Sequence, residues 1–446
     1  MASISELSGA ADQEDTYILV TGTNSGLGFS ICCRLIDNFL ISRPRTHSLT
    51  LLFTTRSPRK SNETLTRLQN HLRSVSRGNA ATENRVKLQP EHVDLGDLLS
   101  VRALARRLLS STPKLDVLVL NAGIAGFTGL NWFRAAFMIV TNLIHAVTWP
   151  AAYCLSKVGV IAKKQTSLPD EPPLGELFCA NVFGHYMLSH ALMPLLSKSS
   201  DPPSRIIWTS SLEATSEVFD VSDIQGLRIS RAYESSKYLT DVLALTSNLP
   251  SAAPWVNTFM TPDDLSSDPE KPSQQQQPLT KPNIYLSHPG ICGTSIMPLM
   301  LPLFYAMLGA FWMARLFGSP WHVMSAYKGA AASVWLSLAP QSVLDTAEAA
   351  YAHLGGGKVK WGSSCDRLGH EKVVCTEVEG WGFGGLVGGA ASEDDKKRMR
   401  KTGAKDLTAD QRVEFEELGR KCWREMEELR VKWDKLLTEE ENKRLN

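Results

Sequence analysis

A chain of 446 residues is long enough for one large domain with additions, or for two domains. Its 47 lysines and arginines nearly balance its 46 aspartates and glutamates, so it lacks the basic excess of a nucleic-acid-binding protein. The eight cysteines form no CxxC pair and no cluster with histidine, which argues against a metal site and is typical of reduced thiols in a cytosol-facing protein.

The chain opens with 16 polar and acidic residues, which do not have the pattern of a signal peptide. An apolar strand at 17–21 then runs into the glycine turn TGTNSGLG and a helix. Glycines in such a turn let the backbone approach a pyrophosphate, and the helix N-terminus supplies amide donors. The turn therefore predicts a dinucleotide site, for which the candidate residues are Gly22, Asn24, Ser25, Gly26, Leu27 and Gly28.

A second strand, SLTLLFTTR, ends at Arg56, with Arg59 and Lys60 shortly after it. An acidic residue at this position favours NAD, whereas a guanidinium stacks on adenine and pairs with a 2′-phosphate. We therefore expect NADP(H) as cofactor, with Arg56 and Lys60 in contact with it; Arg59 and Lys60 as plain surface cations are the alternative.

Further strands are predicted in RVKLQPEHVDL, LDVLVLNAG, SRIIWTSS and PNIYLSHPG, with amphipathic helices such as LLSVRALARRLLS between them. This alternation predicts an α/β fold with a doubly wound parallel sheet of the Rossmann type. Asp94 and Asn121 follow two of these strands. We expect Asp94 to accept from the adenine amine and Asn121 to lie beside the cofactor, although either side chain could instead stabilise a turn.

Three insertions interrupt the main domain, which we assign to residues 1–391: residues 124–175, 250–282 and 294–326. The middle one, with SSDPEKPSQQQQPLTKP, is of low complexity and predicts a mobile surface loop over residues 250–282. The other two hold apolar runs at 135–156 and 289–314 without a charged side chain. Because about 20 apolar residues can cross a bilayer, these runs suggest membrane contact. We expect helices lying in the membrane interface, with buried helices over an apolar pocket as the alternative, and leave open whether 296–314 spans.

Residues 392–446 are highly charged and predict a helical tail. Thr408 and Gln411 have the spacing of a capping box, and apolar residues then recur every three or four positions. Packing on the same chain and binding of a partner helix are both compatible with this pattern. The apolar positions are Phe415, Leu418, Cys422, Met426, Leu429, Trp433 and Leu436.

The motifs TGxxxGxG at 21–28, NAG at 121–123, a serine pair at 210–211, YxxxK at 233–237 and PG at 289–290 occur in this order. In this combination, over roughly residues 15–345, the chain resembles the short-chain dehydrogenase/reductase family. More narrowly, the segments WTSSLEA, YESSKYLTDVLAL, SHPGICGTSI, GSSCDRLGHEKV, EVEGWGFGG and GLNWFRAAFMIVTNLIHAVTWP resemble the fungal 3-ketosteroid reductases of ergosterol synthesis.

Tyr233 and Lys237 are four residues apart and so share one helix face. A neighbouring ammonium lowers the pKa of a phenol, so we expect Tyr233 to be a proton donor near neutral pH. The resemblance implies that Lys237 also binds the nicotinamide ribose and that Ser211, rather than Ser210, orients the ketone. It further implies that Asn181 anchors a water relay, with a helix-kink residue as the alternative, and that Thr294 binds the carboxamide.

The resemblance implies NADPH-dependent reduction of a 3-keto sterol to the 3β-alcohol during sterol C-4 demethylation. It also implies the cytosolic face of the endoplasmic reticulum or lipid droplets, and contact with the C-4 demethylation complex and lanosterol synthase. Reduction of retinal or another steroid is one alternative. A scaffold for sterol enzymes, using the charged tail and the apolar helices, is another.

Overall fold

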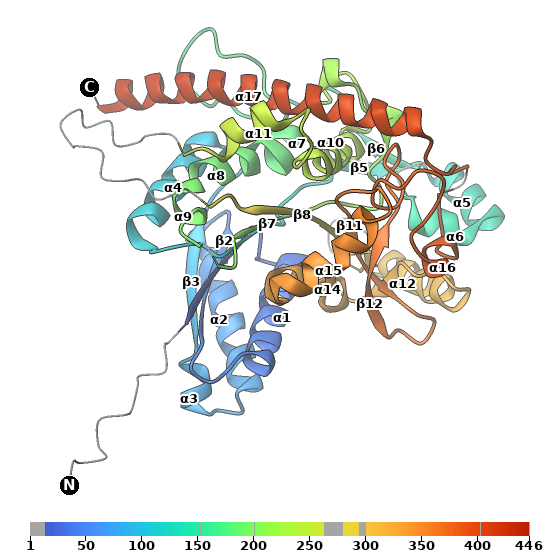
Figure 1. The fold of residues 1–446 in the computed structure, drawn as a ribbon, viewed down its shortest axis with the longest axis horizontal. Coiled ribbons are helices and arrows are strands. Elements are labelled where there is room, and N and C mark those ends of the chain that lie inside the picture. Colours follow the sequence, from blue (N-terminus) through green and yellow to red (C-terminus); the bar gives the residue numbers. More distant parts are fainter. Residues whose placement is uncertain are drawn as a thin grey trace.

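The computed structural model describes residues 14–150, 153–199, 201–262, 280–293, 300–401 and 403–445. An eight-stranded sheet crosses the centre of the molecule in the order β12-β11-β8-β7-β4-β1-β2-β3 (Figure 1). Neighbouring strands are parallel except for β11 and β12. The strands are β1 (Asp15–Val20), β2 (Ser48–Thr55), β3 (Val86–His92), β4 (Val117–Leu120), β7 (Arg205–Thr209), β8 (Asn283–His288), β11 (Lys360–Cys365) and β12 (Glu371–Thr376).

Helices cover both faces of this sheet, and a separate hydrophobic core fills the space on each side. The α/β fold with a doubly wound, mostly parallel sheet is therefore confirmed. One face carries α1 (Gly26–Ser42), α2 (Pro58–Val75), α13 (Ala326–Gly329), α14 (Ala331–Leu338) and α15 (Gln341–Ala352). The other carries α4 (Leu98–Ser111), α7 (Glu176–Phe178), the π-helix η2 (Cys179–Phe183), α8 (Gly184–Ala191), α9 (Met193–Leu196), α10 (Ala232–Thr246) and α11 (Ala253–Met260).

The last two strands, β11 and β12, were not predicted from the sequence. β11 is buried along its whole length, yet its sequence KWGSSC is mostly polar or small and shows neither an apolar run nor alternation. Its polar side chains are used internally: Lys358, just before it, donates to the carbonyl of Ile284, and Ser363 donates to that of Gly329. A strand whose polar groups are satisfied by the protein interior gives no hydrophobic signal.

The first insertion folds as β5 (Phe127–Leu130), α5 (Trp132–Thr141), α6 (Leu143–Thr148) and β6 (Cys154–Ser156). The third contains β9 (Ile291–Cys292), α12 (Leu301–Leu316) and β10 (His322–Met324). Helices α5, α6 and α12 gather at one end of the molecule (Figure 1), and α6 packs against α12 through Val147, Phe311 and Ala314. Within the described ranges, every helix is too short or too polar to cross a bilayer.

The middle insertion differs from the predicted loop in its first part. Helix α11 occupies residues that were assigned to a mobile loop, and its Val256 and Phe259 lie in the hydrophobic core. With Met260, these side chains hold the helix against the core. The sequence did not reveal this contact, because the adjoining low-complexity stretch dominated the composition of the segment. Residues 263–279 lie outside the described part of the chain.

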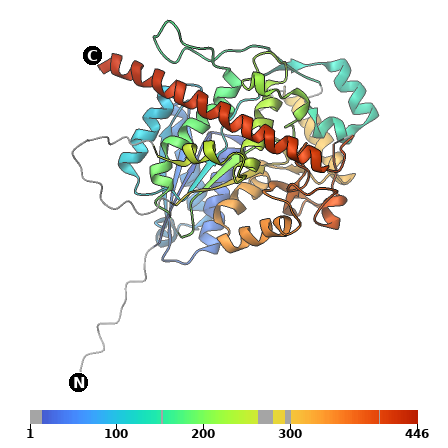
Figure 2. The same cartoon turned by 45° about the horizontal axis from the view of Figure 1, so that its top comes forward.

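The tail forms one long helix, α17 (Ala409–Leu445), which runs across α10 and α11 on the outside of the molecule (Figure 2). The predicted capping box is present, since the backbone amide of Thr408 donates to Gln411 Oε1 and that of Gln411 donates to Thr408 Oγ1. Its apolar stripe is buried in the same core as α10, at Phe415, Cys422, Met426 and Trp433. The tail therefore packs on its own chain.

The remaining short elements are α3 (Ala80–Glu83), α16 (Glu393–Lys396), and the 3-10 helices η3 (Ser216–Val218) and η4 (Val221–Asp223).

Candidate active site

The glycine turn joins β1 to α1 at the carboxyl end of the parallel strands, where α/β proteins bind nucleotides. Gly22 and Gly26 have φ angles of +71° and +56°, which favour glycine. A Cβ on Gly28 would lie 2.2 Å from the carbonyl oxygen of Gly22. Ser25 is exposed, precedes α1 and makes no side-chain capping bond, so the first amides of the helix are not blocked by it. The turn thus fits a pyrophosphate.

Two residues predicted to contact the cofactor have structural partners. Asn121 donates from Nδ2 to the carbonyl oxygens of Thr21 (2.9 Å) and Gly22 (3.3 Å), and so holds the glycine turn against β4. Asp94 accepts at Oδ1 from the amide of Gly96, at 3.0 Å, and remains exposed. Both side chains therefore stabilise a turn, which was the alternative stated for them.

The cations after β2 lie at the rim of this turn. Arg56 is exposed, while Lys60 is half-buried in the first turn of α2, where its amide donates to Ser57 Oγ. A further cation, Arg67 on α2, was missed by sequence reasoning: its NH1 donates to the carbonyl of Asn24 at 2.9 Å, and its guanidinium lies 3.8 Å from the centroid of the Phe29 ring. Leu27 packs into the core beside Phe29.

Helix α10 carries Tyr233 and Lys237 and is buried along its whole length. The two side chains face the same way, as their spacing predicts, with Lys237 Nζ 5.9 Å from the centroid of the Tyr233 ring. Lys237 Nζ donates to the carbonyl of Thr209, at the end of β7, at 2.8 Å. A Cβ on Gly123 would lie 3.8 Å from the same Nζ, so the NAG loop after β4 approaches the lysine closely.

The two serines after β7 face opposite sides, as neighbours on an extended chain do. Ser211 makes a hydrogen bond with the side chain of Tyr233 and is half-buried. Ser210 is buried, and its hydroxyl donates to the carbonyl of Lys237 at 3.4 Å. The structure therefore brings Ser211, Tyr233 and Lys237 together and places Ser210 behind them.

The predicted lowering of the Tyr233 pKa is wrong for this arrangement. Burial raises the pKa of the phenol, and the hydrogen bond to Ser211 offsets only part of that shift. The lysine has less influence than expected because its Nζ is engaged with the Thr209 carbonyl rather than with the phenol oxygen. Burial also lowers the pKa of Lys237 to about 8, against the opposing effect of Asp241.

Asn181 lies in the π-helical turn η2, a local widening that is frequent at functional sites. Its side chain accepts from the amide of Ile124 at 2.8 Å, donates to the carbonyl of the same residue at 2.9 Å, and donates to Ser236 Oγ at 3.2 Å. Asn181 thereby connects the loop after β4 to α10. It coincides with a helix irregularity, as the alternative assumed, and it lies within the cluster around Lys237.

His185 connects Thr21, at the start of the glycine turn, to Asn181. Its Nε2 lies 2.9 Å from Thr21 Oγ1, and its Nδ1 lies 3.2 Å from the main-chain oxygen of Asn181. The Asn181 carbonyl can only accept, so Nδ1 carries the proton and Nε2 accepts from Thr21. Burial lowers the pKa of His185 to about 3, which keeps the ring neutral. No sequence motif marks this contact. Thr294, predicted to bind the carboxamide, lies outside the described residues.

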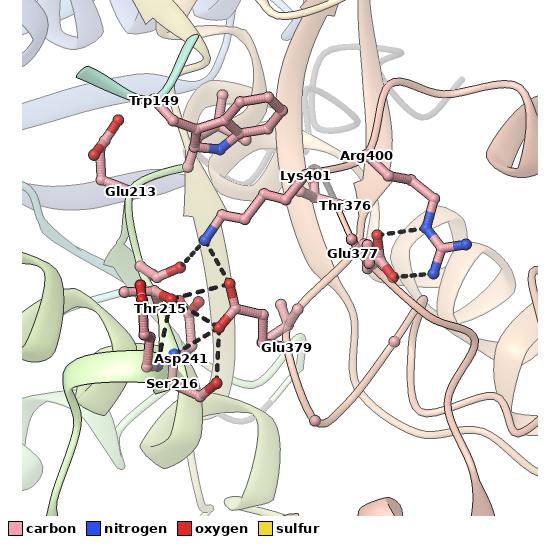
Figure 3. A pocket seen from close by; sticks show the side chains of 18 of the residues that line it. Trp149, Glu213, Thr215, Ser216, Asp241, Thr376, Glu377, Glu379, Arg400 and Lys401 are labelled. Carbon is pink, nitrogen blue, oxygen red and sulfur yellow. Dashed lines mark hydrogen bonds and ion pairs between the residues drawn. The ribbon is translucent and has the colours of Figure 1, made fainter. Parts of the chain in front are cut away.

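A cavity of about 640 Å³ lies beside the loop that follows Ser211 (Figure 3). Its lining includes Arg134, His145 and Trp149 from the first insertion and Trp321 from the third. Residues 212–217 and segments after β12 also line it. Both apolar insertions therefore contribute to the lining of this cavity, which contains Leu212 and Asp241 but none of Ser211, Tyr233 and Lys237. The described residues contain no group of three or more His, Cys, Asp or Glu arranged to hold a metal ion.

Curated relatives match the chain along most of its length. It is 58% identical over 433 residues to the 3-keto-steroid reductase of Aspergillus fumigatus, with 95% of each chain covered. It is 39% identical to the enzyme of the same name from Gibberella zeae, again over 95% of both chains. The corresponding protein of Schizosaccharomyces pombe is 31% identical, over 81% of this chain and 90% of its own.

Among solved structures, salutaridine reductase from Papaver somniferum matches with a TM-score of 0.41 at 19% identity, over 73% of this chain and 96% of its own. A 7α-hydroxysteroid dehydrogenase in complex with NADH and 7-oxo glycochenodeoxycholic acid matches with a TM-score of 0.40 at 14% identity, over 74% and 90%. No family model matches. The full-length similarity to the curated relatives, together with the ordered motifs around Tyr233 and Lys237, shows that this chain belongs to the short-chain dehydrogenase/reductase family, in its branch of fungal 3-keto-steroid reductases.

Proposed function

We propose that the protein reduces the ketone of a 3-keto sterol to the 3β-alcohol with NADPH, in the C-4 demethylation steps of ergosterol synthesis. The observation that carries the proposal is the convergence of Ser211, Tyr233 and Lys237 beside the glycine turn, in a chain whose relatives are named 3-keto-steroid reductases. A ketone with its oxygen between the Ser211 and Tyr233 hydroxyls would have one hydrogen-bond partner on each side.

The donor set at the first turn fits a nicotinamide dinucleotide. Gly22, Gly26 and Gly28 keep the turn close to the backbone of β4, and Asn24, Ser25 and the first amides of α1 are in position to bind phosphate. The exposed Arg56 at the end of β2 favours a 2′-phosphate and hence NADP(H), with Lys60 and Arg67 as further cations at the same rim. When bound, such a cofactor supplies hydride to the carbonyl carbon.

Tyr233 is suited to give the accompanying proton to the carbonyl oxygen. Because burial raises the pKa of its phenol, the hydroxyl remains protonated at neutral pH, which is the form that a ketone reduction requires. Ser211 can donate to the same oxygen and fix its direction. The ammonium of Lys237 lies on the same side of α10, where it stabilises negative charge that develops on the phenol oxygen after the proton has left.

Asn181 and His185 hold this arrangement in place. The side chain of Asn181 fixes the loop after β4 through hydrogen bonds to both the amide and the carbonyl of Ile124. His185 connects Asn181 to Thr21, at the start of the glycine turn. Since small displacements of reacting groups cost large factors in rate, these contacts matter even though neither side chain touches the phenol. A water relay from Asn181 to Lys237 remains part of the proposal.

The apolar insertions support a large hydrophobic substrate and a membrane-bound source for it. Helices α5 and α12 expose an apolar surface formed by Trp132, Phe133, Phe137, Ile139, Val140, Leu301, Tyr305, Trp312, Met313 and Leu316. Amphipathic helices with aromatic residues on their exposed side insert shallowly into the lipid interface. We therefore propose attachment to the cytosolic face of the endoplasmic reticulum or to lipid droplets, near other sterol enzymes such as the C-4 demethylation complex and lanosterol synthase.

The test is an assay of purified protein on vesicles that carry a 4-methyl 3-keto sterol, with NADPH and NADH in parallel. We expect the 3β-alcohol to form with a marked preference for NADPH, and Tyr233→Phe to abolish it. Turnover of retinal in place of the sterol would contradict the substrate assignment. Equal use of NADH would contradict the role given to Arg56. If cells depend on the chain but tolerate Tyr233→Phe, the scaffold alternative would replace catalysis as its main task.

A further inference from the structure

Lys360, the first residue of β11, is buried next to the predicted active site and has two acceptors. Its Nζ donates to the main-chain carbonyl of Ser211 at 2.8 Å and to Asp241 Oδ2 at 2.6 Å. The side chains of Lys360 and Asp241 are 3% and 1% exposed, so both charges are withdrawn from water. An ion pair this deep seldom improves stability over an apolar pair, because each ion loses its hydration. Its presence here calls for another role.

Asp241 lies four residues after Lys237 and eight after Tyr233 on α10. Residues at this spacing occupy one face of a helix, so Tyr233, Lys237 and Asp241 form a row that points toward β7 and β11. Lys237 donates to the carbonyl of Thr209, two residues before the carbonyl of Ser211 that Lys360 holds. The segment at the end of β7 is thus fixed by two buried lysines, and Asp241 pairs with Lys360 and also acts electrostatically on Lys237.

We propose that Asp241 and Lys360 are positioning residues for the reductase site: Lys360 holds Ser211 through its backbone, and Asp241 supplies the negative charge that keeps Lys237 in its protonated, productive place. The inference rests on the proposed ketone reduction. It adds to that reaction two residues that touch neither substrate nor cofactor and that lie outside the YxxxK and serine motifs.

The charges around Lys237 agree with this arrangement. Burial lowers the pKa of Lys237 to about 8, Asp241 acts to raise it, and Lys360 on β11 acts to lower it. Lys401, from the segment after α16, acts to lower the pKa of both Asp241 and Lys360. His185 faces Lys237 from α8 but is neutral, because burial lowers its own pKa to about 3. The hydroxyls of Tyr233 and Ser211 complete the surroundings. Among these groups, Asp241 provides the negative charge that favours the ammonium.

Two single variants separate the two roles. Lys360→Met removes the donor to the Ser211 carbonyl, and we expect kcat for the sterol to fall on the order of 10-fold or more with little change in KM, as misplaced groups cost rate. Asp241→Asn keeps an oxygen that can accept from Lys360 but removes the charge. We then expect the alkaline limb of the kcat profile to move to lower pH, by about one unit, because the pKa of Lys237 falls. The double variant should combine the fall in kcat with part of the shift in the pH profile, because the Lys360 charge that is removed also acts to lower the pKa of Lys237.

The buried pair Glu427 and Arg430 on α17 is the matched control, since it is equally buried and lies outside the site. Glu427→Gln should lower the melting temperature without moving the pH profile. The inference is overturned if Asp241→Asn and Lys360→Met, with native circular dichroism, retain both kcat and the pH profile, or if Glu427→Gln shifts the profile equally. Should Lys360→Met fail to fold, the near-isosteric Asp241→Asn decides alone. If the unmodified protein turns over no sterol, the proposed function fails first and this inference with it; unchanged variants of an active enzyme overturn the inference alone.

Discussion

The ring of Phe127 meets the ring of Tyr233 edge to face, with 5.8 Å between their centroids. Phe127 is the first residue of β5, so the first insertion contributes directly to the apolar wall around the predicted proton donor. The first insertion therefore forms part of the active-site surroundings. It helps to set the burial that raises the pKa of Tyr233.

Phe127→Ala should lower the rate of ketone reduction, because it removes part of the apolar wall around Tyr233. Loss of the ring admits water to the phenol, which moves the pKa of Tyr233 back toward its ordinary value and loosens the contact with the ketone. We expect kcat/KM for the sterol to fall on the order of 10-fold, which corresponds to about 1.4 kcal/mol of transition-state stabilisation. Phe127→Leu, measured in the same assay, should retain most of the activity. Equal values for the alanine variant and the unmodified protein would contradict the contact's role.

Gly28→Ala should strongly weaken dinucleotide binding. Its new methyl group would lie 2.2 Å from the Gly22 carbonyl and 2.5 Å from Asn121 Nδ2, both part of the turn, so the turn itself has to move. Fluorescence titration with NADPH should show at least a 100-fold weaker Kd, or about 2.7 kcal/mol. Gly129→Ala is the control, because a Cβ there meets no atom within 4 Å. Tight binding by Gly28→Ala would exclude this turn as the phosphate site.

Lys237→Met should make the protein inactive and more stable. The pKa of Lys237 is about 8 in the folded chain against a reference of 10.5, so burial of its charge costs free energy of unfolding at every pH below 8. The cost disappears as pH rises from 8 through 10.5, where the unfolded chain also loses the proton. Chemical denaturation at pH 7 should show a gain of about 1–3 kcal/mol for the variant, shrinking above pH 8. A loss of stability at pH 7 would mean that the bond to Thr209 outweighs the burial penalty.

Glu379 connects the segment after β12 to the loop that follows Ser211, as Figure 3 shows. It accepts from the Thr215 hydroxyl and from the amide and hydroxyl of Ser216, and it pairs with Lys401 at 2.7 Å. Burial alone would raise its pKa, but the charge and hydrogen bond of Lys401 and the bonds from Ser216 outweigh burial and lower the pKa to about 2. The carboxylate thus stabilises the fold fully above pH 4.5, and this contribution is lost as pH falls toward 2.

Glu379→Gln should therefore lower the free energy of unfolding at pH 7, by about 1–3 kcal/mol. The difference from the unmodified protein should narrow between pH 4.5 and pH 2, which acid titration of the folded signal measures. Glu393→Gln serves as the comparison, because Glu393 is exposed and pairs with Lys396 one turn away. If both substitutions had the same small effect, the loop contact would contribute nothing measurable.

Sequence patterns predicted six of the seven parallel strands of the main sheet, the glycine turn, the shared face of Tyr233 and Lys237, and the capping box of α17. These features depend on local spacing or on apolar runs, which a single sequence displays. The contacts of Lys360, Asp241 and His185 could not be predicted in the same way, because each joins elements that are distant in the chain. The position of Asp241 could nevertheless have been predicted from the sequence, because it continues the four-residue spacing from Tyr233 and Lys237.

The missed strands and the misjudged phenol have a common cause. The polar segment KWGSSC forms an interior strand because the surrounding layers bury it. Burial also has a larger effect on the pKa of Tyr233 than the nearby ammonium does. A sequence shows which charges can be neighbours, but the degree of desolvation follows only from the assembled layers.

The exposed apolar surface of α5 and α12 should bind lipid. Phe133 and Phe137 are 92% and 69% exposed on α5, and burial of one such side chain is worth about 1.5–3 kcal/mol. Phe133→Ser combined with Phe137→Ser should weaken binding to phosphatidylcholine vesicles on the order of 10-fold or more in a flotation assay, while turnover of detergent-solubilised sterol stays intact. Ile41→Ser is the matched control, since Ile41 is 82% exposed on α1, which covers the opposite face of the sheet from α10. Vesicle binding that is insensitive to the α5 pair but reduced by the Ile41 change would place the lipid-facing surface elsewhere on the molecule.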